Sequence, residues 1–179
     1  MSSAALLPSL LALALAVPQA PESGPAPDGE RPPLTLFFAD GASQPLRSWS
    51  LSWEYAAWPR GESPTRGAVT RREATDLLVG KKVLPTAGLL LQVEYAGDLV
   101  RGLRMVGKDG KTSPLKADPP AAELLSSKLG KDMSVQVRVL DLAGETLTGG
   151  KRSYCLLTYT PLVSCVAEAG QRIVKIQFP

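Results

Sequence analysis

The stretch SWSLSWEY, residues 48–55, decides the fold class, because its polar and apolar residues alternate strictly. Successive side chains of a β-strand point to opposite faces of a sheet. One face would then carry the serines and Glu54, and the other would carry the large side chains. The alternation therefore predicts a strand with one buried face, formed by Trp49, Leu51, Trp53 and Tyr55.

The size of these aromatic side chains favours burial. Trp and Tyr each present about 150–250 Å² of surface, so three of them would fill or exceed the apolar patch of about 300–600 Å² that a typical monomer exposes. The other interpretation is a ligand platform, such as a strip that stacks on sugar rings. Trp58, beside Pro59, would lie on the same face of the strand as the serines. We therefore treat it as a candidate ligand contact, with a covering loop as the alternative.

Further strands are expected on both sides of this stretch. LTLFF (34–38) precedes an Asp40-Gly41 turn and a long run to Trp58, which is a hairpin signal. Turn residues recur at intervals of about a dozen residues, without a strand–helix–strand rhythm. We therefore expect an all-β fold, mainly an antiparallel sandwich or small barrel, with later strands within 89–95, 99–106, 133–142 and 172–178.

One short helix is expected in this fold. Asp118 suits the N-cap, Pro119 suits the first helical position, and Glu123 favours the positive end of the helix dipole. Gly130 can end the helix after Leu129. The buried side of the helix would consist of Leu124, Leu125 and Leu129.

The N-terminal region has the composition of an export signal. Residues 4–17 are mostly apolar, a stretch shorter than the ~20 residues needed to span a bilayer and typical of a secretory signal peptide. We assign residues 1–20 to a signal peptide with cleavage after Ala16 or Ala20. The usual positive start is missing, since no Lys or Arg precedes Arg31.

The rest of the chain divides in two. Residues 21–33 are rich in Pro and Gly and would form a disordered linker. Residues 34–179 are enough for a single β domain with a substantial core. We expect this domain to be secreted or periplasmic, with no membrane span once the signal peptide is removed.

The two cysteines support an oxidising compartment. Cys155 and Cys165 lie symmetrically about Thr160, and Thr160-Pro161 is where the chain should reverse. With a three-residue loop the two cysteines would lie opposite each other in a hairpin, close enough for a disulfide. The alternative is two buried thiols in a reducing cytoplasm. A metal site is not expected, since two thiolates without histidine rarely complete a zinc shell.

Missing residue types exclude several kinds of chemistry. The chain has no histidine, which excludes Ser-His-Asp and Cys-His catalysis and imidazole-based zinc sites. With 20 basic and 17 acidic residues and no long run of like charge, no nucleic-acid partner is expected. No glycine-rich phosphate loop is present, and we expect no cofactor. A carboxylate-based hydrolase stays open if acidic side chains meet in space, the candidates being Glu54, Glu73, Asp76 and Glu94.

Three segments carry a family resemblance: SWSLSW (48–53), DLLVGKKVLPTAGLLL (76–91) and TYTPLVSCVAEAGQRIVKIQF (158–178). The order is a tryptophan–serine strand, a strand–loop–strand middle and a closing hairpin. In this order of segments, residues 46–178 resemble the tube protein of type VI secretion, also called hemolysin-coregulated protein. The resemblance implies a small β-barrel with one helix, related to phage tail tubes, that stacks as rings. Tube subunits normally lack a signal peptide, and the paired cysteines suit an oxidising space, so the chain departs from the family in two features.

These observations lead to one expectation of function and two alternatives. The chain is expected to be an exported bacterial β domain, not an enzyme, that acts as a binding or structural module of the envelope. The bacterial origin rests on the form of the signal and the Ala-, Gly-, Pro- and Arg-rich composition. Its partner would be a protein or envelope component, and a homo-oligomer is compatible with the sequence. The alternatives are a tube-forming ring oligomer and a carboxylate-based hydrolase.

Overall fold

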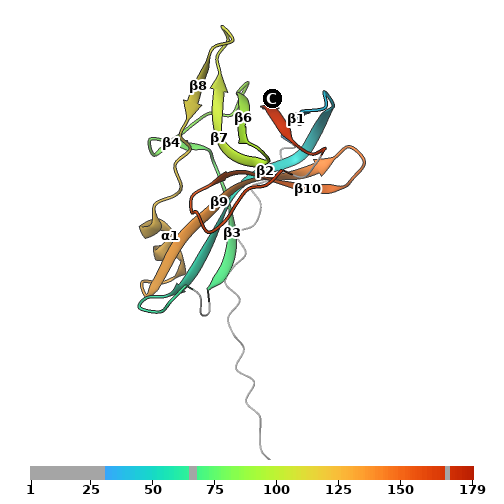
Figure 1. Cartoon of the computed structure of the whole chain (residues 1–179). Helices are drawn as coiled ribbons and strands as arrows, with labels where there is room; N and C mark the ends of the chain where they lie inside the picture. Colours follow the sequence, from blue (N-terminus) through green and yellow to red (C-terminus); the bar gives the residue numbers. More distant parts are fainter. Residues whose placement is uncertain (1–30, 65–67, 168–169) are drawn as a thin grey trace, which may run out of the picture.

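The computed structural model describes residues 31–64, 68–167 and 170–179. The chain folds as an all-β domain with one short helix (Figure 1), which confirms the expected fold class. The elements in chain order are β1 (Leu34–Phe38), β2 (Ser43–Pro59), β3 (Val69–Thr75), β4 (Leu78–Val79), β5 (Lys82–Val83), β6 (Leu90–Ala96), β7 (Leu99–Val106), β8 (Thr112–Leu115), α1 (Ala122–Leu129), β9 (Met133–Thr146), β10 (Lys151–Thr158) and β11 (Ile173–Gln177).

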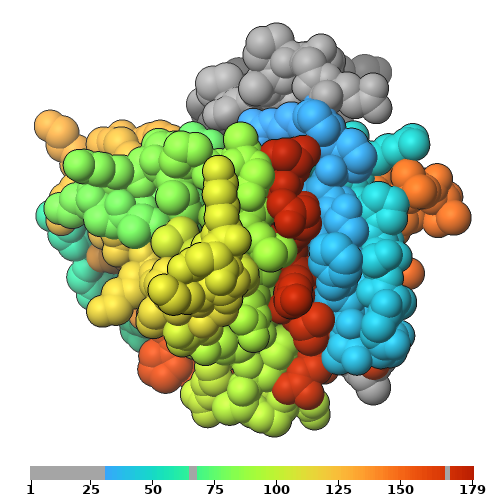
Figure 2. Space-filling view, turned by 90° about the horizontal axis from the view of Figure 1, so that it is seen from above, coloured from blue at the N-terminus to red at the C-terminus, as the bar shows by residue number. Residues whose placement is uncertain are grey.

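One antiparallel sheet contains most of these strands. Its order is β10-β9-β2-β1-β11-β6-β7-β8, and β3 pairs with the far part of β2. The last strand, β11, lies between β1 and β6, and Figure 2 shows it as a red band between blue and green neighbours. The end of the described chain therefore joins the first hairpin to the β6–β7 hairpin.

The sheet curls until β10 comes beside β7. The segment that follows β10 makes the connection there, because the Val100 N–H donates to the Cys165 carbonyl over 2.9 Å and Leu99 forms a bridge with Val166. We call this junction of β10, residues 163–167 and β7 the seam. The sheet thus folds back on itself, and β10 and β7 meet along the seam.

The long strand β2 supplies the centre of the core. The four large side chains of its alternating stretch are 1–6% exposed, as the alternation predicts: Trp49, Leu51, Trp53 and Tyr55. The Trp53 ring meets Tyr159 edge-on at 5.4 Å between centroids. Its indole N–H donates to the Thr75 hydroxyl on β3 over 2.6 Å, so burial leaves this donor satisfied.

Trp49 fixes the start of the described chain. Its indole N–H donates to the Pro32 carbonyl over 3.0 Å, and the guanidinium of Arg31 lies 5.2 Å from its ring centroid. On its other side the Trp49 ring packs edge-on against Phe178 at 5.2 Å. The expected signal peptide and most of the expected linker, residues 1–30, lie outside the described residues.

A β-bulge interrupts the pairing of β2 with β9. The register shifts between Arg47 and Ser50, and Ser48 takes a left-handed backbone with φ 45°. On the facing strand, a Cβ at Gly144 would lie 2.5 Å from Cγ of Leu46. The close approach of the two strands at this bulge therefore requires glycine.

The helix begins later than the sequence predicts. α1 starts at Ala122, and its N-cap, Ala121, makes no capping hydrogen bond through its side chain. The assignments of Asp118 as N-cap and Pro119 as first helical residue are wrong. The carboxylate of Asp118 instead accepts the backbone N–H of Lys81 over 3.1 Å, so it holds the β4–β5 hairpin.

The other end of the helix follows the prediction. Gly130 has φ 113°, and its N–H donates to the Ser126 carbonyl over 2.9 Å. Leu125 is buried and Leu129, four residues on, is half-buried, because α1 packs through a narrow stripe. The expectation that Leu124 is buried is wrong, since its side chain is 53% exposed.

Candidate functional site

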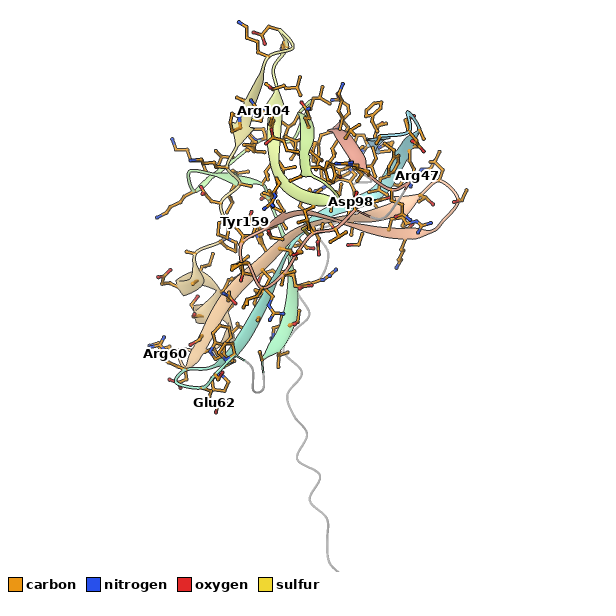
Figure 3. All side chains as sticks on the ribbon, viewed as in Figure 1. Arg47, Arg60, Glu62, Asp98, Arg104 and Tyr159 are labelled. Carbon is orange, nitrogen blue, oxygen red and sulfur yellow. A yellow bond between two sulfur atoms is a disulfide. The ribbon has the colours of Figure 1, made fainter. Side chains whose placement is uncertain are left out.

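An open groove runs between α1 and the start of β9, with a volume of about 570 Å³. That volume falls within the range of about 300–1,000 Å³ that ligand sites occupy. The groove lies at the end of the molecule that carries α1, where Figure 3 places Arg60. We call it the α1–β9 groove; its lining consists of Arg60, Ala122, Glu123, Ser126, Ser127, Lys131, Met133, Ser134 and Val135.

The strand that borders this groove has a free edge. On one side β9 pairs with β2 along its whole length. On the other side β10 pairs with β9 only over Val139–Glu145. Within the described residues, the stretch 133–137 of β9 therefore has a neighbouring strand on one side only.

Two hydrogen bonds show which peptide groups point to the free edge. The Arg60 N–H donates to the Asp132 carbonyl over 2.6 Å, so the carbonyl of Asp132 points toward β2. The next N–H, that of Met133, turns the other way and donates to the Gly130 carbonyl over 3.3 Å. Peptide groups alternate in direction along an antiparallel strand. The N–H and C=O of Val135 therefore point away from β2, toward the free edge.

The groove carries unpaired charge. Arg60, Lys131 and Glu123 line it, and in the part of the chain that the structure describes none of the three belongs to a salt bridge. Two cations against one carboxylate leave the groove with a positive balance. Sequence reasoning missed this site, because its residues come from three separate segments and show no motif.

Trp58 lies next to the groove but does not line it. It is half-buried, and it pairs across the strands with Ser134, which does line the groove. Its side chain points to the face opposite that of Ala57, since neighbouring residues of a strand alternate. Trp58 remains a candidate contact, accessible in part.

The two predicted cysteines form a disulfide, with Cα atoms 5.5 Å apart. The chain turns after Thr160 and brings Cys165 back beside Cys155, but the predicted pairing of two strands around Thr160-Pro161 is wrong, because the returning segment bonds to β7 and β10 pairs with β9. Cys165 instead bonds to β7, as described for the seam. The disulfide therefore ties β10 to β7 through that segment.

Two cavities flank the disulfide. The larger, of about 450 Å³, lies between residues 99–101 of β7 and the segment 158–165. The smaller, of about 140 Å³, lies on the side of Cys155 and Tyr95. In the larger cavity Tyr159 donates its hydroxyl to the Ala117 carbonyl over 3.0 Å, and burial raises the pKa of that hydroxyl. Tyr159 thus serves as a fixed hydrogen-bond donor.

A buried carboxylate lies on the outer face of β9. Asp141 is 4% exposed and lies 3.3 Å from the guanidinium of Arg72, which also binds Glu54 at 2.9 Å. Burial raises the pKa of Asp141 above its ordinary 3.8, Arg72 opposes that rise and Glu54 adds to it. Arg72 therefore sits between two carboxylates that would otherwise repel each other.

The four candidate carboxylates of a hydrolase are not gathered in one place. Glu54 binds Arg72, whereas Glu73 binds Lys128 on α1. Glu94 binds Arg104 on β7 at 3.3 Å. Glu73 lies opposite Trp53 in the β2–β3 pairing, next to the position of Glu54, so these two carboxylates point to opposite faces. Asp76 follows β3 in the chain, and its carboxylate forms no salt bridge with any described residue.

Comparisons with protein-family models, with curated proteins and with solved structures find no match for this chain. Among the described residues, no helix combines the length and the apolar character needed to cross a membrane.

Proposed function

We propose that the protein is an exported bacterial domain, without enzymatic activity, that binds another protein or an envelope component. The observation that carries this proposal is the α1–β9 groove, an open volume beside a free strand edge with unpaired charge. Exposed strand edges are unusual because they invite pairing with other chains. A groove that lies beside an exposed strand edge is suited to binding another chain.

Site-specific photo-crosslinking tests the binding role. A photoreactive benzoylphenylalanine placed at Ser127 in the groove should give an adduct with a partner when the host that encodes the chain is irradiated. The matched control is the same residue at Lys111, whose side chain is 88% exposed on the β7–β8 turn, away from the groove. Adducts from neither position, or equal adducts from both, would contradict a role for the groove.

Export is supported by the disulfide, which suits an extracellular or periplasmic location. The test is the intact mass of the protein isolated from its host, measured with and without reduction. Cleavage after Ala16 or Ala20 and a gain of two protons on reduction are expected. A full-length mass with free thiols would contradict export.

Assembly into rings is the second candidate, and it rests on the resemblance to tube proteins. One observation favours it: β3 and β8 are both terminal strands of the described sheet, so the molecule has two further edges at separate places. Head-to-tail pairing of different edges generates a ring where the rotation between subunits closes, and a filament where it does not. Light scattering of the purified protein distinguishes a ring from the monomer expected of a binding module.

A carboxylate hydrolase is the least supported of the three functions. Such enzymes need two carboxyl groups on either side of an accessible bond. The close pair here, Glu54 and Asp141, has Arg72 between its members, and Asp141 is buried. This arrangement supports a structural role for the pair.

A further inference from the structure

We propose that the free edge of β9 binds an extended acidic peptide as an added strand, with alternate peptide side chains entering the α1–β9 groove. This inference rests on the proposed function, because it names the partner of the same groove. Strand addition combines main-chain hydrogen bonds, which give affinity, with side-chain pockets, which give specificity.

The backbone of β9 defines the shape of the occupant. The N–H and C=O of Val135 point away from β2 and have no strand partner in the described chain. Met133 offers its carbonyl in the same direction, while its N–H is bonded to Gly130. Donors and acceptors at every second residue match a peptide in β conformation, whose own groups repeat with the same period.

The side chains of the groove define what fits beside that backbone. The α1 wall is made of small residues, Ala122, Ser126 and Ser127, which leave room next to the helix. Met133 and Val135 give β9 an apolar surface there. Since strand side chains alternate, every second peptide residue would face this lining, and medium-sized apolar side chains suit it.

The charge of the groove favours a partner peptide over a second copy of this chain as the occupant. Arg60 and Lys131 leave the groove with a positive balance. Among the other strands with a single strand neighbour, β8 lies between Lys111 and Lys116, whereas on β3 the charge of Arg72 is balanced by Glu54 and Asp141. Like charges opposite each other in a strand pair are destabilising. An acidic strand from another protein is therefore the better complement.

The test is NMR titration of the isotope-labelled full chain with two short synthetic peptides, Asp-Thr-Val-Thr-Val-Asp and Lys-Thr-Val-Thr-Val-Lys. The acidic peptide should shift the amide signals of Met133, Val135 and Ser127. It should bind about three- to tenfold more tightly than the basic peptide at low salt, with the difference shrinking as salt is added. The charge-reversed double variant Arg60→Glu, Lys131→Glu should invert this preference.

Two N-methylated forms of the acidic peptide test the backbone contact. One carries methyl groups on both Val nitrogens and the other on both Thr nitrogens. Only one of these sets can face β9 in a strand, so one form should lose most of its binding and the other should keep it. On the protein side, Val135→Pro removes an N–H that points away from β2 and should weaken binding of the unmethylated peptide.

Several outcomes would overturn the inference. These are the absence of shifts with either peptide, shifts confined to β3 or to the seam, and equal binding by both methylated forms. Shifts at 133–135 on raising the protein concentration alone would identify a second copy as the occupant. If a crosslinked partner is found from Ser127 while both peptides fail, the strand-addition inference fails and the binding function stands.

Discussion

The disulfide between Cys155 and Cys165 joins a strand at one end of the sheet to a segment that hydrogen-bonds a strand near the other end. Through Cys165 and its contact with Val100, it holds the two sides of the seam together. Without the covalent link, β10 and β7 would be joined at the seam by non-covalent contacts alone. Reduction of the disulfide would therefore act on this fold at the seam.

Loss of the disulfide should lower the free energy of unfolding by about 2–3 kcal/mol, the value for a short closed loop. The measurement is urea denaturation of the oxidised and the reduced protein. The double variant Cys155→Ser, Cys165→Ser should match the reduced protein and should not respond to reductant. Equal midpoints for oxidised and reduced protein would show that the link adds nothing to stability.

The substitution Gly144→Ala should destabilise the domain by about 1–3 kcal/mol, a typical cost of overpacking. A Cβ at Gly144 meets the Leu46 side chain at 2.5 Å and the Arg47 carbonyl at 2.9 Å, and the carbonyl cannot move independently of β2. The control is Gly102→Ala on β7, where the nearest atom is a Glu94 carboxylate oxygen at 3.4 Å. Thermal denaturation of the two variants should separate them, and similar melting temperatures would contradict the packing argument.

The contribution of Asp141 to the stability of the protein should be lost as the pH rises through the pKa of this group in the folded state. Because burial raises that pKa above 3.8, the folded protein keeps a proton that the unfolded chain has already lost. The contribution is fully present below pH 3.8 and is lost above the folded pKa. Asp141→Asn cannot titrate, so its stability should fall less than that of the wild type between acid and neutral pH.

Urea denaturation at several pH values measures this difference. The control is Asp132→Asn, which removes an exposed carboxylate. A parallel pH dependence of the wild type and Asp141→Asn would contradict the prediction.

Iodide should quench the fluorescence of one tryptophan in three. Trp49 and Trp53 are 6% and 1% exposed, whereas Trp58 is half-buried at the edge of the molecule that carries the groove. The variant Trp58→Phe should therefore lose the quenchable fraction and keep the rest. If all three indoles were quenched to the same extent, the aromatic face of β2 would not be buried.

The parts of the fold that were predictable from the sequence are those set by local pattern. The alternation from Trp49 to Tyr55 indicates a strand with one face in the core, and Gly130 indicates the end of a helix. β3 was not predicted, because its sequence VTRREAT is polar on both faces and its only strand neighbour in the described sheet is β2. Its strand conformation comes from that pairing.

Other features depend on contacts between distant residues. The Thr160-Pro161 stretch has turn chemistry, but the bond from Val100 to Cys165 determines where the chain goes next. Asp118 has the chemistry of a helix cap, yet it binds Lys81 on another element. The α1–β9 groove likewise has no local signal, since Arg60 and Lys131 come together only after β2 pairs with β9.

Trp49 touches both Pro32 and Phe178, so the entry into the domain and its last residues share one end of the domain. Figure 1 shows the carboxyl end at the top and α1 at the lower left. Immobilisation or labelling through Pro179 would therefore leave the helix-bearing end facing outward, unobstructed by the support. A carboxyl-terminal handle is accordingly suited to bait experiments that probe the α1–β9 groove.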